Sequence, residues 1–373
     1  MQVDAIVVGD GISGRLAYRV LKRLGLDAII IAPKGSIQAD HRNTAILPLS
    51  VNYLYGLGVN VSSKATPLLG ILIESLGSFG FIEERFSAKE VEETYLALNL
   101  PISDLANLMP IEKHLEDKIS EINSSKTCVT VKTNRGYQIT ARLVIAADGK
   151  SSIAHKSANI RIWQRLLGLS ALCVPVALNA PHYGLCIERY DNTGSITIVP
   201  LGTHNGSLIR IAQTEMIDKL MSTGLLGIEI DTRIRQPAYK QLKITTVPVV
   251  FPLSIGCSLS PARDRIVAVG DAAHVLPPLG AQGWNLAVRD MITLEKVLSV
   301  VARVGGDIGS AETLSRYSCQ RRYELTAYLI TIGILTKIAT STSLFGHLTR
   351  EFWLRRLSGD INIKHWLMRK GLS

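Results

Sequence analysis

The most constraining feature of this sequence is a glycine-rich turn, Gly9–Gly14, near the N-terminus. The turn directly follows a strand-like apolar run over Asp4–Val8 and opens a helical pattern over Arg15–Leu24. A second apolar run, Ala28–Ala32, comes next. Strand, turn, helix and strand in this order form one βαβ unit, so the chain is expected to begin with a Rossmann-like domain.

The spacing of the glycines within the turn predicts a dinucleotide site. Gly9 permits the tight turn, Gly11 lets the backbone approach a pyrophosphate, and Gly14 lets the helix and the strand pack closely. Ser13 lies in the same turn, at a helix N-terminus that favours the negative charge of phosphates. A glycine-rich turn can also be purely structural, and this one does not distinguish NAD from FAD.

One residue of the usual dinucleotide-binding pattern is missing. The second strand of such a unit normally ends in Asp or Glu, which accepts hydrogen bonds from the adenosine ribose. This chain has Ala32 at that position, followed by Pro33 and Lys34. Loss of the acceptor costs on the order of 1–3 kcal/mol of cofactor affinity. Either the site tolerates this loss or FAD binds weakly.

A second motif follows another apolar strand, Ile266–Val269. The strand ends in Gly270 and Asp271, where a carboxylate can accept hydrogen bonds from a polyol such as the ribityl chain of a flavin. Two prolines stiffen the next turn, and two glycines let backbone amides meet a flat ring at the start of a helix. An ordinary strand–loop–helix would not require the acid, the glycines and the helix start together. The residues predicted to bind the cofactor here are Asp271, Pro278, Gly280, Gln282, Gly283 and Asn285.

A third strand-like run, Leu143–Ala147, ends in Asp148 and Gly149. Alone, this pattern is more typical of a structural β-turn than of a binding site.

The rest of the sequence predicts a second domain inserted into the first. Short β-rich segments separated by Asn, Gly and His turns between Ala171 and Val250 indicate an antiparallel sheet, and the pattern is helical from Ala311 onward. The fold class is therefore expected to be α/β, with an antiparallel substrate domain and C-terminal helices. The expected parts are an FAD-binding domain over 1–170 and 251–320, with substrate-domain segments near 45–100, a substrate domain over 171–250 and a helical region over 321–373.

The three motifs in this order resemble the group A flavoprotein monooxygenases, of which para-hydroxybenzoate hydroxylase is typical. Finer features are similar to the ubiquinone-biosynthesis hydroxylases, and the resemblance covers nearly the whole chain. The matching segments are Asp40-His41-Arg42, Glu188-Arg189-Tyr190, Ile198–Leu201, Phe251–Leu253, Gly280–Asn285 and Arg289-Asp290. By this resemblance, Asp148 belongs to the cofactor site and Arg42 helps to hold FAD. The Glu188 and Ile198 segments are strands of the substrate domain.

The sequence also departs from the family pattern in three places. Ala32 replaces the ribose acid, His155 stands where the Asp-Gly motif usually continues to an arginine, and the segment Leu98–Cys128 is short where the family carries a helix beside the flavin ring. These departures put FAD affinity and turnover in question.

The resemblance implies a flavin-dependent monooxygenase that hydroxylates the aromatic ring of a polyprenylated phenol, with FAD as cofactor and NAD(P)H and O2 as co-substrates. The cofactor carries the chemistry, so no catalytic side chain and no metal site are expected. His274 is an acid–base candidate, but its place beside the cofactor helix favours a structural role. The five cysteines are scattered and are expected to be reduced.

Charge and hydropathy bear on location and partners. The net charge of +10 suits an anionic membrane or phosphate-bearing ligands, whereas only 6% aromatic residues argues against nucleic acid. The sequence begins directly with a strand, so no signal peptide is expected, and Leu325–Thr336 is too short to span a bilayer. A cytoplasmic protein, with peripheral attachment to the inner face of the membrane as an option, is expected.

The C-terminal region is the candidate for such attachment. Residues 321–373 carry nine Lys and Arg against three acids, together with Phe345, Phe352, Trp353 and Trp366. Basic and bulky apolar residues on helices suit an interfacial helix. The alternative is a solvated helical cap whose aromatic side chains pack inward.

Two other functions stay open at this stage. One is another flavoprotein of the same fold, such as an epoxidase or a prenyl reductase. The other is a non-catalytic, FAD-poor subunit of a ubiquinone-biosynthesis assembly, which Ala32 favours and the intact Gly280–Asn285 segment opposes. The ring position that is hydroxylated, the preferred nicotinamide and the oligomeric state cannot be read from the sequence.

Overall fold

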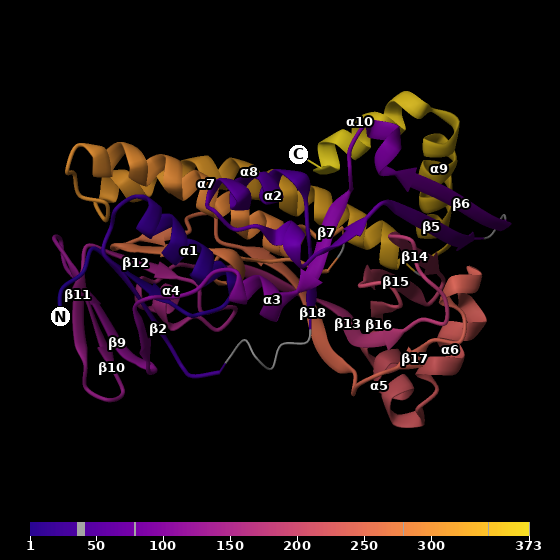
Figure 1. The fold of residues 1–373 in the computed structure, drawn as a ribbon, viewed down its shortest axis with the longest axis horizontal. Helices are drawn as coiled ribbons and strands as arrows, with labels where there is room; N and C mark the ends of the chain where they lie inside the picture. The colour runs from indigo at the N-terminus through magenta and orange to yellow at the C-terminus, as the bar shows by residue number, and fades with distance from the viewer. Residues whose placement is uncertain (36–41, 78–79, 279, 342, 373) are drawn as a thin grey trace.

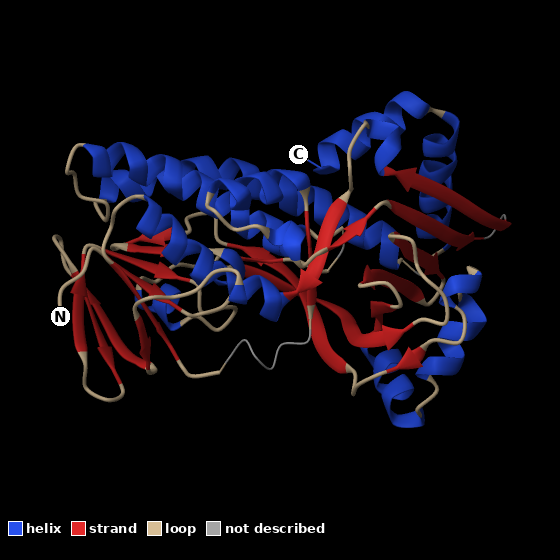
Figure 2. Cartoon of the chain, viewed as in Figure 1, coloured by secondary structure: helices blue, strands red, loops and turns tan. Residues whose placement is uncertain are grey.

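The computed structural model describes residues 1–35, 42–77, 80–278, 280–341 and 343–372. Two sheets lie side by side along the long axis of the molecule, and long helices run across both (Figures 1 and 2). The predicted α/β class, with an antiparallel sheet and C-terminal helices, is confirmed. The domain boundaries themselves stay a prediction.

The first sheet has six strands in the order β19-β20-β12-β1-β2-β8, and all its pairings except β19–β20 are parallel. Its central strands are apolar and completely buried, as expected for a parallel sheet covered on both faces. Its strands are β1 (Ala5–Val8), β2 (Ala28–Ala32), β8 (His114–Glu116), β12 (Leu143–Ala146), β19 (Ala262–Arg263) and β20 (Ile266–Ala268).

Different layers cover the two faces of this sheet. On one face, helices α1 (Ile12–Arg23) and α7 (Gln282–Arg303) share an apolar core with the sheet. On the other, α4 (Ile153–Ser157) and a three-stranded sheet close a second core. That sheet consists of β9 (Ile119–Ser124), β10 (Val129–Thr133) and β11 (Gln138–Ala141).

The large second sheet is mostly antiparallel, with the order β21-β18-β13-β16-β15-β14-β5-β6 and β17 beside β13. Strands β5 and β6 come from the region near 45–100, and β5 pairs in parallel with β14. Helices α5 (Thr214–Thr223) and α6 (Leu226–Arg233) cover one face. The strands are β5 (Gly70–Gly77), β6 (Gly80–Ser87), β13 (Trp163–Ala177), β14 (Leu185–Asp191), β15 (Gly194–Leu201), β16 (Asn205–Gln213), β17 (Lys243–Ile244), β18 (Val249–Cys257) and β21 (His274–Val275).

Smaller elements and the C-terminal helices connect the two sheets. A small sheet pairs distant segments in the order β3-β7-β4, next to α2 and α3. Helix α8 packs on α7 and extends to β18, while α9 lies over β5 and β6 (Figure 1). These elements are β3 (Asn43–Ile46), α2 (Pro48–Gly56), β4 (Thr66–Leu68), β7 (Ala97–Pro101), α3 (Ile102–Asn107), α8 (Ala311–Thr340), α9 (Leu344–Gly359) and α10 (Ile361–Leu372).

Candidate FAD site

The glycine turn has the close packing that its sequence predicts. Gly9 has φ +101°, and a Cβ there would lie 2.6 Å from the carbonyl oxygen of Ala147. A Cβ on Gly14 would lie 1.9 Å from the carbonyl oxygen of Gly9. At Gly11, by contrast, an added Cβ would meet nothing within 4 Å. The turn therefore fits a pyrophosphate, because it is closed toward the sheet and open above the helix N-terminus.

The first turn of α1 is available to an anion. Gly11 is its N-cap residue, and no side chain makes a capping hydrogen bond there. The backbone N–H groups at this end have no intrahelical partner, and the helix dipole places partial positive charge beside them. On the next turn, Arg15 donates to the carbonyl oxygens of Ala106 and Met109, at 3.1 and 3.2 Å, which ties α1 to the end of α3.

Ser13 joins the glycine turn to the second motif. Gly270 has φ +57°, and a Cβ there would lie 2.8 Å from the hydroxyl oxygen of Ser13. Asp271, next in the chain, is exposed on the short 3₁₀ helix Gly270–Ala272. The fold thus brings the first and second motifs together, with an exposed carboxylate beside their contact.

Asp148 of the third motif also lies against the glycine turn. Its Cα would be 3.0 Å from a Cβ added to Gly9. One carboxylate oxygen accepts a hydrogen bond of 2.8 Å from the backbone N–H of Ile153, while the other is buried without a hydrogen-bond partner. An unsatisfied buried acceptor is costly and indicates a missing donor, which a hydroxyl group of a bound cofactor would supply.

The segment before α7 turns sharply at the junction of the two sheets. Strand β21 pairs with β18 of the large sheet, whereas α7 packs on the first sheet. Gly280 and Ala281 both have positive φ, +60° and +57°, and Ala281 is the N-cap residue of α7. Around Gly283 an added Cβ would find open space. Pro278 and Gln282 are half-buried on either side of this turn.

Asn285 holds this turn in place. Its side-chain amide donates to the carbonyl oxygens of Ala45 and Ala281, at 2.9 and 2.6 Å, and its Oδ1 accepts from the backbone N–H of Leu47 at 3.0 Å. The residue is buried, so these bonds link the start of α7 to β3 and α2. Asn285 therefore positions the candidate site, and a direct contact with FAD stays a prediction.

A buried ionic network beneath the site was only partly visible in the sequence. Asp290 accepts hydrogen bonds of 2.8 Å from the backbone N–H of Gly270 and from Nε of Arg321. Its carboxylate also lies 2.8 Å from Nε2 of His274. Burial alone would raise the pKa of Asp290, but the charges of His274 and Arg321 and these hydrogen bonds hold it below its ordinary value. His274 is buried in this network, in agreement with the structural role favoured above.

The remaining predicted residues come from segments outside these motifs. Asp40 and His41 fall outside the described residues. Arg42 is exposed just before β3, and its charge reaches Cys173, whose pKa burial raises to about 11 against the effect of that charge. His155 lies in α4, where its backbone N–H donates a hydrogen bond to the hydroxyl of Ser152. Burial lowers the pKa of its side chain. The contact of Arg42 with FAD stays a prediction.

The Glu188-Arg189-Tyr190 segment lies inside the large sheet, on β14. Tyr190 donates a hydrogen bond of 2.7 Å to Glu188, whose pKa burial raises despite that bond. On the neighbouring strand, Glu74 is buried 3.3 Å from Arg189. These carboxylates belong to the interior of the second sheet, as expected for a substrate-domain strand.

The structure corrects part of the predicted basic C-terminal face. Arg321 is completely buried against Asp290, and Arg350 is buried with its Nε donating to Ser75. Lys364 forms ion pairs with Glu84 and Glu90. These three basic side chains interact with carboxylate, hydroxyl or carbonyl groups of the protein instead of with water. Residues 321–373 therefore expose fewer basic side chains than the sequence count indicates.

Sequence similarity to known proteins extends over most of the chain. The family described as "FAD binding domain" matches residues 260–328, which include Asp271 and the start of α7. The ubiquinone hydroxylase UbiL of Rhodospirillum rubrum is 24% identical over 332 residues, covering 86% of this chain and 77% of that protein. The human ubiquinone biosynthesis monooxygenase COQ6 is 25% identical over 279 residues, covering 65% and 60%.

Solved structures agree with the fold. The p-nitrophenol 4-monooxygenase PnpA from Pseudomonas putida superposes with a TM-score of 0.84 at 17% identity, over 100% of this chain and 98% of that one. Klebsiella pneumoniae HpxO, complexed with FAD and uric acid, gives a TM-score of 0.79 at 18% identity, over 100% and 96%. The comparisons confirm the predicted resemblance and fold class, and they agree with FAD as the cofactor and a flavin-dependent monooxygenase as the enzyme class.

Proposed function

We propose that this chain, a homologue of the ubiquinone-biosynthesis hydroxylases with the fold of FAD-dependent monooxygenases, hydroxylates the aromatic ring of a polyprenylated phenol. The observation that carries the proposal is the packing of all three motifs on one turn: Asp148 lies against Gly9, and Gly270, next to Asp271, lies against Ser13. Related proteins named as ubiquinone hydroxylase and ubiquinone biosynthesis monooxygenase support the substrate class.

The roles of the chain's own residues follow from their positions. The first turn of α1 would bind the pyrophosphate, and Asp148 and Asp271 would accept hydrogen bonds from hydroxyl groups of the cofactor. The N-terminus of α7 favours negative charge where the flavin ring is expected. When bound, FAD would supply the oxygen transfer, with NAD(P)H and O2 as co-substrates.

Product analysis tests the reaction. The FAD-loaded protein is incubated with a prenylated phenol, NADH or NADPH, and ¹⁸O2. The proposal expects a product that is heavier by one oxygen atom, with that atom derived from O2. A product that gains two hydrogens and no oxygen would instead identify a prenyl reductase, and ¹⁸O in the prenyl chain an epoxidase.

A non-catalytic, FAD-poor scaffold remains the competing function, and the absence of an acid at Ala32 is the observation that favours it. Failure of the purified protein to take up added FAD would support the scaffold and contradict the hydroxylase.

We further propose that helices α9 and α10 attach the protein to an anionic membrane surface, where a polyprenylated substrate would reside. Phe352, Trp353 and Trp366 are 64, 49 and 60% exposed, which contradicts the alternative that these aromatics pack inward. Arg355 and Arg369 are exposed on the same two helices. No helix of the described residues is both long and apolar enough to cross a bilayer.

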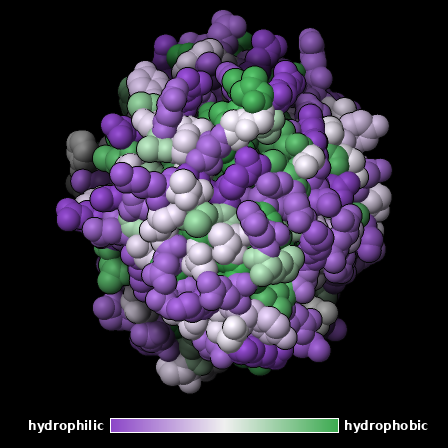
Figure 3. Space-filling view, turned by 90° about the vertical axis from the view of Figure 1, so that its left-hand side faces the viewer, coloured by the Kyte–Doolittle hydropathy of each residue, from purple (hydrophilic) through white to green (hydrophobic). Residues whose placement is uncertain are grey.

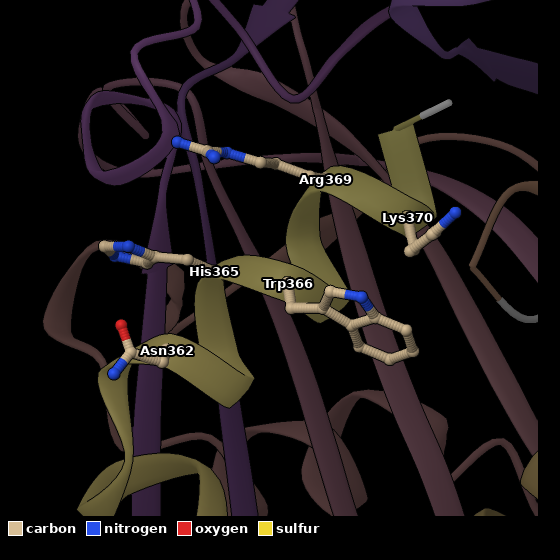
Figure 4. A pocket seen from close by; sticks show the side chains of 5 residues that line it. All are labelled: Asn362, His365, Trp366, Arg369 and Lys370. Carbon is tan, nitrogen blue, oxygen red and sulfur yellow. The ribbon is translucent and has the colours of Figure 1, made fainter.

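Helix α10 also borders a hollow of about 490 Å³. Figure 4 shows His365 and Arg369 projecting to one side of this helix and Trp366 and Lys370 to the other. By contrast, the face at the other end of the molecule, shown in Figure 3, is mainly hydrophilic with apolar residues in small groups. Mixed cationic and aromatic side chains suit a phospholipid headgroup layer.

Co-sedimentation with vesicles tests the attachment. In vesicles containing phosphatidylserine, Arg355→Ala/Arg369→Ala should weaken binding about 30-fold, since each basic residue near an anionic surface contributes about 1 kcal/mol. Trp366→Ala should weaken it as well. The matched control is Tyr183→Ala, because Tyr183 is 80% exposed but lies in the large-sheet region. Equal binding by all these variants would contradict the proposal.

A further inference from the structure

The edge strand of the first sheet supplies a carboxylate beside the position where β2 lacks one. Ala32 is the last residue of β2 and is buried. Strand β8 runs parallel to β2 and ends at Glu116, which is paired in register with Ala32. Neighbouring strands of a sheet lie about 4.8 Å apart, so the two Cα positions are one strand spacing from each other.

The register also places both side chains on the same face. Ile31 and its partner Leu115 pack in the core on the α4 side of the sheet, whereas Ala32 packs in the core shared with α1. Successive residues of a strand alternate between faces, so Glu116 projects on the α1 side together with Ala32. This is the side on which the glycine turn opens into α1.

Glu116 differs from the next carboxylate in the chain in its availability. The Glu116 side chain is 48% exposed, and Lys34 lies 4.0 Å away with 83% of its own side chain exposed. Such a surface ion pair contributes little and is easily exchanged. Asp117, in contrast, is buried and accepts hydrogen bonds from the backbone N–H groups of Lys118 and Arg135 at 2.8 and 3.0 Å. Asp117 therefore fixes a turn, and Glu116 is the acceptor that a ligand can reach.

We infer that Glu116 accepts the hydrogen bonds of the adenosine ribose hydroxyls of FAD, in place of the acid that is absent at Ala32. Glutamate is one methylene longer than aspartate, which helps its carboxylate to reach toward β2. The inference rests on the proposed function, because it presupposes that the glycine turn binds FAD.

The test compares FAD with FMN, which lacks the adenosine monophosphate part of FAD. Apo-protein is titrated with FAD and with FMN, and binding is followed by flavin fluorescence. Glu116→Ala should weaken FAD binding about tenfold, or about 1.4 kcal/mol, and leave FMN binding unchanged because FMN has no adenosine. The matched control is Glu112→Ala, since Glu112 lies just before β8, is 73% exposed and pairs with Lys22. It should change neither affinity.

A second variant moves the acid back to the usual strand. Ala32→Glu introduced into the Glu116→Ala protein should restore most of the lost FAD affinity. Wild-type FAD affinity in Glu116→Ala, or an equal loss for FAD and FMN, would overturn the inference and leave the proposed function intact. A wild-type protein that binds no FAD would overturn both.

Discussion

Replacing Gly11 by alanine should separate cofactor binding from folding. An alanine Cβ at this position meets no atom of the chain within 4 Å, and the backbone angles of Gly11, φ −57° and ψ 169°, are ones that alanine adopts. Reduced freedom of the unfolded chain stabilises by about 0.4–1 kcal/mol, whereas alanine is a poorer N-cap residue than glycine. These opposing effects should leave the free energy of unfolding of the apo-protein within about 1 kcal/mol of wild type.

FAD binding by Gly11→Ala should nevertheless fall at least tenfold, about 1.4 kcal/mol, because the added methyl group occupies space that the pyrophosphate needs. Urea unfolding of the apo-protein and fluorescence titration with FAD measure the two effects separately. Gly14→Ala is the matched contrast: its Cβ would lie 1.9 Å from the Gly9 carbonyl oxygen, so it should lose both stability and FAD binding. A Gly11→Ala protein with normal stability and wild-type FAD affinity would refute the assignment of this turn.

Three further predictions concern the second motif. Asp271→Ala should retain about tenfold less FAD at unchanged apo-protein stability, because Asp271 is exposed; full flavin content after purification would contradict its predicted role. Asp290→Asn should lower the free energy of unfolding by about 3–5 kcal/mol, measured in urea, because it removes the buried carboxylate partner of Arg321 and leaves that charge only the half-exposed Glu324; a loss under about 1 kcal/mol would disprove that reasoning. Because the pKa of Asp290 is depressed in the folded protein, its contribution is present above the unfolded value of about 3.9 and is lost as the pH falls through the folded value. The stability difference between wild type and Asp290→Asn should therefore be constant from about pH 5 to 7 and shrink below about pH 4, and a difference that grows on acidification would have the wrong sign.

Local sequence patterns predicted much of the fold. The βαβ unit at Gly9–Gly14 and the helix at the second motif were predictable, because glycine positions and apolar runs act over a few residues. The three hairpin strands after Leu185 were predictable for the same reason. The parallel pairing of β5 with β14 and the antiparallel pairing of β3 with β7 join segments far apart in the chain, and no local signal specifies such partners.

The same limit applies to the site. Asp271 and the glycines are candidates that the sequence predicts, but the contact of Ser13 with Gly270 depends on the tertiary packing of two distant turns. From the sequence, Arg321 was counted among the basic residues of a surface region, because nothing near it in the chain indicates that it pairs with Asp290 in the core. The role inferred for Glu116 requires the register of β8 against β2, which three residues of strand cannot specify alone.

The visible absorption spectrum of the purified protein tests the central claim most directly. It is recorded with and without added FAD, then under anaerobic conditions with NADH or NADPH, and finally after air is admitted. The account predicts flavin absorption that bleaches with the nicotinamide and returns with air. A colourless protein that takes up no FAD would contradict the account, show that the missing acid at Ala32 is decisive, and make the non-catalytic subunit the better description.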